Sequence, residues 1–396
     1  MATAQPIPDS TAPPPRSSAT VLVLIPAMPM ERLEALLSNL TASLPAESLL
    51  IATPDTPPSG SDPALRIIPA PSGSSSWILT AENFMNAHQL AQTNEAHAIL
   101  MLGSRSDSLR ASVLYDLANA VLSDAVDLAV PCYVLPPNAG LINSAILYPL
   151  SRALFVSRTR FPLAIDLGLS PRMAGRLATA AQRFISLNQG DAPLWPINEA
   201  AIAGFTPREF EAGMRDIPQP HEPDLNSILP LLTGSLFSDI DAKAPFWQRP
   251  RPSPPVRSPI LPTLARDAAA DIAPMIESFH LAHTNLQEIW SLILPPNSLL
   301  GLKRLSVAGA EAFRMPDSLW ARIVYDFLLA YRLRTINRGH LLGALIPLYL
   351  AWVASHINIT ASGTNAESHI EAVAAAFEAD KPYLVSRWRW PDRFSP

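Results

Sequence analysis

The stretch AILMLGSRSDSL, residues 98–109, places polar side chains directly after an apolar segment. Five apolar residues precede Gly103, and a short polar turn with Arg105 and Asp107 follows it. In an α/β protein, a strand that stops at such a turn is where ligands and metal ions are usually held. This turn is therefore the first candidate site.

A second carboxylate stands in an apolar context. Asp166 lies in the run PLAIDLGLS, ahead of Gly168 and Ser170. A carboxylate there must be paired, must cap a helix or must face a ligand. Ser170 and Pro171 form a good helix start, which favours a capping role. The local sequence leaves a site role and a structural role open.

Histidines offer weaker candidates for a metal site. His280 and His283 lie three residues apart on a predicted helix, and Glu277 is the only carboxylate at ligand spacing. We interpret them as an exposed or capping pair. His221 lies in the loop PQPHEPD, whose default interpretation is a solvated loop. Residues 73–76, GSSS, could offer backbone amides to a phosphate, but we interpret them as a flexible Pro/Ser turn.

Composition and motifs exclude several classes of protein. The sequence contains no Walker loop, GxGxxG motif after a strand, HExxH, GxSxG or CxxC pair. The net charge of −5 offers no basic surface for nucleic acid. A single cysteine, Cys132, fits a reducing compartment. The N-terminal residues lack the basic start and apolar core of a secretion signal, so we expect a cytoplasmic protein.

Apolar and helix-like segments alternate in the first part of the chain, which predicts a mostly parallel, doubly wound sheet flanked by helices. Strands are predicted at residues 20–28, 48–55, 65–71, 98–102 and 126–136, and helices at 33–44, 78–93 and 108–122. Ligands in such sheets bind beyond the carboxyl ends of the strands.

The chain divides into four predicted regions. They are a disordered tail at 1–19, a sheet domain at 20–242, a proline-rich linker at 243–264 and a helical subdomain at 265–396. The longest apolar run, residues 341–357, approaches the ~18 residues of a membrane span. It contains Pro347 and follows an amphipathic helix, so we predict a buried helix and no transmembrane segment.

Several stretches together resemble the GT-A glycosyltransferases of the family 2 type, near the glucosyl-3-phosphoglycerate and mannosylglycerate synthases. VLVLIPAM stands where that family opens its nucleotide-binding sheet, and AILMLGSRSDS where it has its Asp-x-Asp metal motif. INSAILYPLSRALF and FPLAIDLGLS are similar to its acceptor-side helix and the Asp-bearing loop that follows. The resemblance implies a GT-A-like fold with a C-terminal helical subdomain.

The resemblance also implies roles for individual residues. Asp166 would be catalytic, and would orient the acceptor or act as a base. The implied donor and nucleotide-binding residues are Pro26, Asp55, Ser104, Arg105 and Asp107. The implied acceptor-side residues are Asn143, Tyr148 and Arg152. His221 would match the family's late metal-binding histidine, in a loop of different length.

The chain departs from the family at the metal motif. Leu102, Gly103 and Ser104 stand where the family has Asp-x-Asp. In the family those carboxylates hold Mg²⁺ or Mn²⁺ on the diphosphate of a nucleotide sugar. Without them, a divalent metal needs Asp107 to reach it through a rearranged turn. Arg105 is the one basic candidate in this turn for metal-free contact with the diphosphate.

Two functions remain open at this point. The first is a hexosyltransferase with an altered donor site, which moves a sugar from a nucleotide sugar to a small, glycerate-like acceptor. The second is a catalytically silent homologue that acts as a binding or regulatory protein. A third possible function is that of an interaction protein that uses the tail and the linker. The chain could form a homo-oligomer in any of these three cases.

Overall fold

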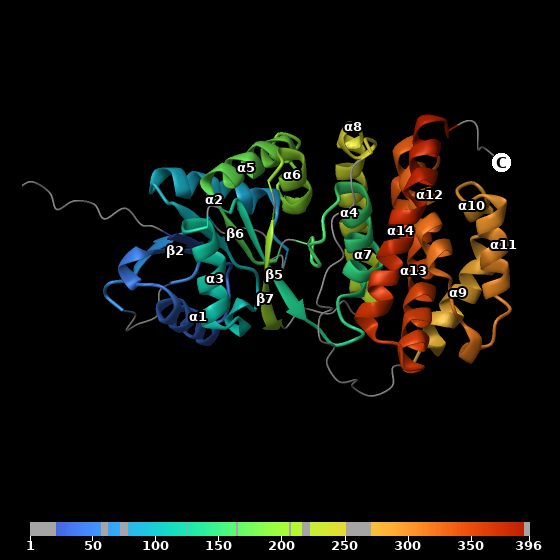
Figure 1. Ribbon diagram of the computed structural model, residues 1–396, viewed down its shortest axis with the longest axis horizontal. Coiled ribbons are helices and arrows are strands. Elements are labelled where there is room, and N and C mark those ends of the chain that lie inside the picture. Colours follow the sequence, from blue (N-terminus) through green and yellow to red (C-terminus); the bar gives the residue numbers. More distant parts are fainter. Residues whose placement is uncertain are drawn as a thin grey trace, which may run out of the picture.

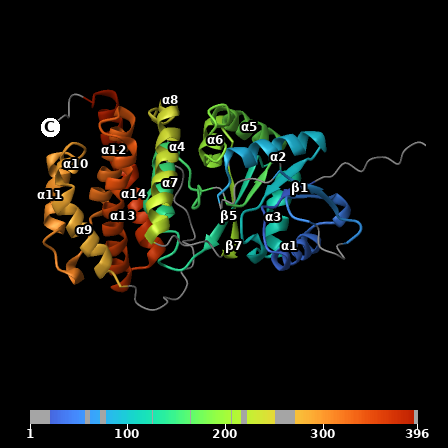
Figure 2. The same ribbon diagram turned by 180° about the vertical axis from the view of Figure 1, so that it is seen from behind.

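The computed structural model describes residues 21–56, 62–71, 78–124, 126–163, 165–205, 207–215, 222–250 and 271–391. The predicted tail, His221 and most of the predicted linker lie outside these residues. Figures 1 and 2 show a sheet with helices on both faces, and beside it a layer of long helices. The two parts are called the sheet part and the helical part below.

A seven-stranded mixed sheet has the strand order β3-β2-β1-β4-β6-β5-β7. Its strands are β1 (Val21–Leu24), β2 (Leu49–Thr53), β3 (Arg66–Pro69), β4 (Ala98–Met101), β5 (Leu128–Val134), β6 (Leu167–Leu169) and β7 (Arg208–Met214). The short β6 runs antiparallel to β4 and β5, and the other neighbours are parallel. This mostly parallel sheet flanked by helices confirms the predicted α/β architecture.

The sheet is covered on both faces, which is why its inner strands read as continuous apolar runs. The covering helices are α1 (Met30–Ser43), α2 (Ala81–Thr93), α3 (Ala111–Leu122), α5 (Pro171–Ile185) and α6 (Pro196–Ala203). Side chains alternate along a strand. Val21 and Val23 therefore pack with α1 and α3, whereas Leu22 packs with α2 and α5 on the opposite face.

Two strands, β6 and β7, are not predicted by the sequence analysis. Three residues are too few for β6 to show a periodic signal. Helix α3 passes so close to β6 that a Cβ at Gly168 would lie 2.6 Å from the carbonyl oxygen of Leu117, so this position requires glycine. β7 lies at the edge of the sheet and reads REFEAGM, with few apolar residues.

The helical part draws on more of the chain than the predicted subdomain. It consists of η3 (Asn143–Leu147, a π-helical turn), α4 (Tyr148–Phe155), α7 (Glu222–Ala242), α8 (Ala244–Trp247), α9 (Ala273–Asn285), α10 (Gln287–Ser291), α11 (Pro296–Leu305), α12 (Asp317–Leu333), α13 (Arg338–Ala361) and α14 (Ala366–Arg389). Three short 3₁₀ turns complete the description: η1 (Ala46–Ser48), η2 (Ser106–Ser108) and η4 (Ala310–Ala312).

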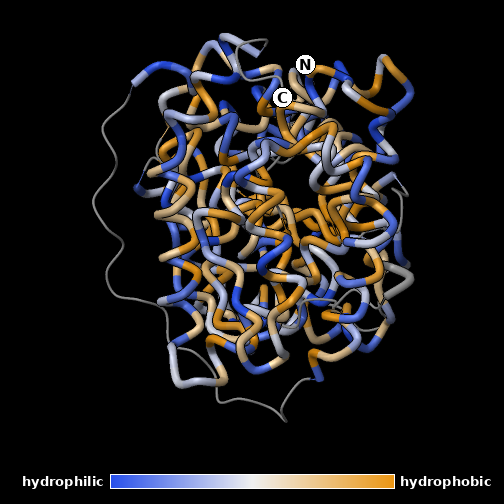
Figure 3. The backbone as a smooth tube through the Cα atoms, turned by 90° about the vertical axis from the view of Figure 1, so that its right-hand side faces the viewer, coloured by the Kyte–Doolittle hydropathy of each residue, from blue (hydrophilic) through white to orange (hydrophobic). Residues whose placement is uncertain are grey.

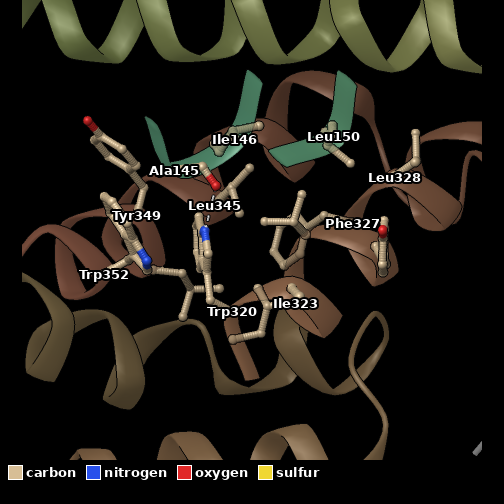
Figure 4. Packing of buried hydrophobic residues seen from close by; sticks show 14 of the residues in the cluster. Ala145, Ile146, Leu150, Trp320, Ile323, Phe327, Leu328, Leu345, Tyr349 and Trp352 are labelled. Carbon is tan, nitrogen blue, oxygen red and sulfur yellow. Dashed lines mark hydrogen bonds between the residues drawn. The ribbon is translucent and has the colours of Figure 1, made fainter. Parts of the chain in front are cut away.

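One hydrophobic core joins these helices. Trp320 of α12 is buried, and its indole Nε1 donates to the carbonyl oxygen of Ala145 at 2.8 Å (Figure 4). Residues expected in the sheet domain thus belong to the core of the helical part. The first residues of the predicted linker are helical as well, because α8 buries Trp247 completely.

Helix α13 is long and apolar enough to cross a membrane. In the structure, 72% of its apolar window is buried, because α7, α9, α12 and α14 pack around it. Figure 3 looks onto the helical part and shows hydrophobic chain near the centre and hydrophilic chain toward the outside. The prediction of a buried helix at residues 341–357 is confirmed.

A chain of buried polar contacts ties the loop after β5 to the helical part. His356 Nδ1 lies 2.7 Å from His369 Nδ1, and His369 Nε2 lies 3.1 Å from Asp317 Oδ1. On its other side, His356 Nε2 lies 3.3 Å from the carbonyl oxygen of Pro137. Both imidazoles are stacked with Trp352.

Acidification is expected to destabilise the protein through His356. Burial, followed by the nearby His369, lowers the pKa of His356 to about 4. An unfolded histidine titrates near ~6.5, so the unfolded chain binds the proton first as the pH falls. Between these values the protein should lose about 3 kcal/mol of unfolding free energy.

Urea unfolding of the wild type and of His356→Gln, at neutral pH and at about pH 4.5, tests this expectation. The wild type should lose more stability than the variant over that interval. An equal loss in both proteins would contradict the assignment to His356.

Candidate functional site

Asp166 occupies the carboxyl edge of the sheet. Because β6 is antiparallel, its first residues lie beside the carboxyl end of β4. Asp166 comes directly before β6 and is 1% exposed. Its Oδ1 accepts from the backbone N–H of Gly103 at 2.9 Å, and its Oδ2 accepts from the Tyr133 hydroxyl at 2.6 Å. This carboxylate therefore joins the ends of three strands.

Arg215 completes this cluster from the end of β7. Its Nε donates to Asp166 Oδ2 at 3.0 Å, and its Nη2 to Asp166 Oδ1 at 3.2 Å. Neither side chain of this ion pair is exposed. Two buried charges are tolerated only when they are paired and hydrogen-bonded, as these are.

The same guanidinium also holds the turn after β4. It donates from Nη2 to the carbonyl oxygen of Ser104 at 2.9 Å, and from Nη1 to that of Arg105 and to Ser108 Oγ. A guanidinium has five N–H donors. The three contacts to the turn and the two hydrogen bonds to Asp166 together equal that number. The structure thus uses Arg215 to bind the turn to the end of β7.

Burial and charge fix the protonation states of Tyr133 and Arg215. Burial, followed by the charge of Asp166, raises the pKa of Tyr133 well above its ordinary value. Burial lowers the pKa of Arg215, but Asp166 more than offsets this, and the pKa is raised overall. Tyr133 therefore remains a neutral donor and Arg215 a cation near neutral pH.

The turn itself contains three of the predicted donor-side residues. Arg105 adopts left-handed backbone geometry, with φ of 62°. Gly103 is required before it, since a Cβ there would lie 2.7 Å from the carbonyl oxygen of Ile165. Ser104 contributes its carbonyl oxygen to Arg215. Asp107 is half-buried, and its Oδ1 is buried without a hydrogen-bond partner among the described residues.

Pro26 and Asp55 lie at the carboxyl ends of the adjacent strands β1 and β2. Asp55 Oδ2 accepts from the backbone N–H of Met28 at 2.8 Å and so ties these two strand ends together. Since β1 lies between β2 and β4, the structure brings all five predicted donor-side residues to one edge of the sheet. Whether they bind a donor stays a prediction.

A divalent cation does not fit the side chains at this edge. The described residues contain no group of three or more His, Cys, Asp or Glu side chains that could hold a metal ion. Asp166 already accepts four hydrogen bonds, Asp55 accepts from the backbone N–H of Met28, and Asp107 adds one further carboxylate. Mg²⁺ and Mn²⁺ prefer several oxygen ligands. His221, the predicted metal ligand, lies outside the described residues.

The predicted acceptor-side residues do not form one site. Asn143 lines a cavity between the sheet part and the helical part. Tyr148 and Arg152 contact α14 instead. The Tyr148 hydroxyl donates to Glu371 Oε1 at 2.7 Å, and Arg152 donates to Glu371 at 2.5 Å and to Glu378 at 2.9 Å. These two side chains therefore attach α14 to α4.

A neighbouring arginine reinforces this attachment. Arg160 is 2% exposed and binds both carboxylate oxygens of Glu367, each at 2.9 Å. Its guanidinium also lies over the rings of Tyr148 and Phe161, at 5.2 and 4.8 Å from their centroids. We define the Arg–Glu interface as Arg152, Arg160, Glu367, Glu371 and Glu378.

The sequence offered only part of this information. Glu367, Glu371 and Glu378 stand at helical spacing, a pattern that places carboxylates on one helix face. Arg215 lies in a polar stretch without a recognisable motif, and its only signal is that a buried aspartate needs a cationic partner. His280 and His283 lie on α9, where both rings are near the Phe279 ring.

Comparisons with known proteins return similar structures only. No protein-family model matches the chain, and no curated protein matches it. Similar solved structures include glucosyl-3-phosphoglycerate synthase from Mycobacterium tuberculosis with Mn²⁺, UDP and glucosyl-3-phosphoglycerate (11% identity, 56% of this chain and 80% of that chain, TM-score 0.37). The same enzyme with phosphoglyceric acid matches at 10% identity (57% and 80%, TM-score 0.37), and a structure described as a mycobacterial protein at 12% (56% and 75%, TM-score 0.37). At this level of similarity, the likeness carries no conclusion about activity.

Proposed function

We propose that this chain is a catalytically silent, glycosyltransferase-like protein that acts in binding or regulation. The Arg215–Asp166 ion pair is the observation that carries the proposal. The resemblance implies that Asp166 orients the acceptor or acts as a base. Here this carboxylate instead pairs with a buried arginine that closes the turn after β4.

The geometry also argues against a metal-free transfer at this cluster. A basic residue that replaces a metal must reach the diphosphate and keep donors available for it. Arg215 is buried, and its donors bind Asp166, Ser104, Arg105 and Ser108. Asp166 cannot serve as a base for an acceptor without breaking its contacts to Gly103 and Tyr133. The cluster therefore supports a structural role.

Nucleotide-sugar binding remains compatible with this role. The loops after β1, β2 and β4 lie at one edge, and Asp107 Oδ1 is an acceptor that the described protein does not use. A bound nucleotide sugar would then be a ligand and not a substrate. Its affinity should not depend on Mg²⁺ or Mn²⁺, because the described residues at this edge include no group of carboxylates that could hold the cation.

The proposal predicts no metal-dependent turnover of UDP-, GDP- or ADP-glucose by the full chain. The measurement is release of the nucleoside diphosphate, together with thermal shift with and without Mn²⁺. Saturation of a native-state site at a hundredfold excess over Kd stabilises the fold by about 2.7 kcal/mol, which is readily detected. Any shift should be the same with and without Mn²⁺.

Two variants make the result decisive. Asp107→Asn removes the unpartnered carboxylate, and Asp191→Asn changes an exposed carboxylate in the loop between α5 and α6. Mn²⁺-dependent release that is lost in the first variant and kept in the second would overturn the proposal. It would then establish an active transferase with an altered metal site.

A further inference from the structure

A cavity of about 740 Å³ lies between the sheet part and the helical part. The π-helical turn, the segment before β6, α7, α9 and α13 supply its walls. Most of the lining is apolar, for example Leu141, Phe161, Leu232, Ile346 and Val353. A volume of this size falls within the ~300–1,000 Å³ of pockets that bind small organic molecules.

The charge of the cavity restricts what can bind there. The charged side chains among its described lining residues are Asp271 and Glu277, both acidic and exposed. None of the described lining residues is lysine, arginine or histidine. An anionic ligand would find no counter-charge and two like charges, which disfavours phosphate or carboxylate groups. A glycerate-like acid therefore does not suit this cavity.

Tyr349 provides a polar group that the protein leaves unused. Its side chain is 5% exposed and lines the cavity. No hydrogen bond to its hydroxyl is found in the described part of the chain, and burial alone raises its pKa. Figure 4 shows the hydroxyl pointing away from Trp352 and Trp320. The hydroxyl oxygen is not among the buried side-chain atoms that lack a partner, so it is open to the cavity, where it can donate to a ligand oxygen.

Asn143 is a second unsatisfied group on the same wall. It is 6% exposed, and its Nδ2 donates to the carbonyl oxygen of Arg160 at 3.0 Å. Its Oδ1 has no partner among the described residues. Most buried polar side-chain atoms in proteins are hydrogen-bonded, so this unpaired oxygen on a lining residue is an exception that adds to the unused Tyr349 hydroxyl.

We propose that this cavity binds a neutral, mostly apolar molecule that carries a hydroxyl group, of the class of long-chain alcohols. The apolar body would displace water from the aliphatic walls, and the hydroxyl oxygen would accept from Tyr349. Tyr133, Asp166 and Arg215 are not among the residues that line the cavity, and the proposal goes beyond the proposed function and does not rest on it.

Decanol and decanoate form the matched pair of probes, since they share one alkyl chain and differ in head-group charge. Isothermal titration calorimetry of the full chain at neutral pH should show saturable decanol binding with a negative heat-capacity change. Decanoate should bind at least about tenfold more weakly, because none of the described lining residues is a cation. Equal or tighter binding of decanoate, or no binding of decanol, would overturn the proposal.

Two variants with matched controls locate the binding. Leu350→Trp fills the cavity and should abolish decanol binding, whereas Leu333→Trp, on an exposed part of α12, should not. Tyr349→Phe should weaken decanol binding about three- to tenfold and leave the fold intact, since the lost hydroxyl has no protein partner. Tyr325→Phe, which removes a hydroxyl that donates to Phe377 at 2.7 Å, should leave binding unchanged.

The combination remains interpretable if the tryptophan variant unfolds, because Tyr349→Phe tests the same site without a volume change. Decanol binding that is insensitive to Tyr349→Phe and equally affected by both tryptophan variants would place the ligand elsewhere and refute the assignment. The calorimetric titrations contain no nucleotide, so their outcome is independent of the test of transferase activity.

Discussion

Replacing Asp166 with asparagine is expected to lower the free energy of unfolding by about 3–5 kcal/mol. The substitution leaves Arg215 buried without a counter-charge, although the side chain keeps its size. The new amide nitrogen would also face the N–H of Gly103, the hydroxyl of Tyr133 or the guanidinium, all of which donate hydrogen bonds.

Urea denaturation of the variant and the wild type measures this loss. Asp124→Asn is the matched control, because Asp124 pairs with Arg208 at the surface, where both side chains are more than two-fifths exposed. An exposed ion pair contributes only about 0–1 kcal/mol, so the control should be nearly neutral.

The outcome separates the two roles of Asp166 that the sequence left open. If the carboxylate acted only on an acceptor, Asp166→Asn would keep its stability and lose product formation. A structural role in a catalytically silent protein predicts a loss of stability, with no product formed by either the wild type or the variant. It also predicts that the double variant Asp166→Leu/Arg215→Met regains part of the lost free energy of unfolding. Replacing both members of a buried ion pair with apolar side chains is often neutral.

Replacing Arg160 with methionine is expected to cost about 3–5 kcal/mol as well. Arg160 is nearly inaccessible, and the variant leaves Glu367 partly buried with no cation bound to both of its oxygens. The contacts of the guanidinium with the rings of Tyr148 and Phe161 are also lost. The effect should appear in the unfolding of α14 from the rest of the helical part.

A double-mutant cycle with Glu367→Gln measures the coupling between the two side chains. The expected coupling lies at about 1–3 kcal/mol, as for residues in direct contact. Arg322 provides the control, because its side chain pairs with Asp380 and is 44% exposed. Arg322→Met should change stability by about 1 kcal/mol or less. Equal effects at Arg160 and Arg322 would contradict the structural role assigned to the Arg–Glu interface.

The sequence alone predicts the elements whose pattern is local. The strands β1 to β5 are found because each is an apolar run that ends at a turn. Helix α13 is predicted to be buried because Pro347 and the preceding amphipathic helix argue against a membrane span. The predicted donor-side residues reach one edge because parallel strands end together.

The sequence does not predict elements that lack such a local apolar pattern. Three residues define β6, and its role depends on α3 approaching Gly168 closely. β7 is a polar edge strand, so hydrophobic periodicity does not mark it. The boundary of the helical part also escaped prediction, because Ala145 and Trp247 join its core through long-range contacts and not through local composition.

By itself, the sequence determines that no carboxylate stands at residues 102–104, because residue identity needs no fold. Only the tertiary structure decides what Asp166 does, since its cation Arg215 lies 49 residues away along the chain. The same holds for Arg152, whose partner Glu371 is 219 residues away. A charge acts on whatever lies within a few ångströms in space, and the sequence lists neighbours only along the backbone.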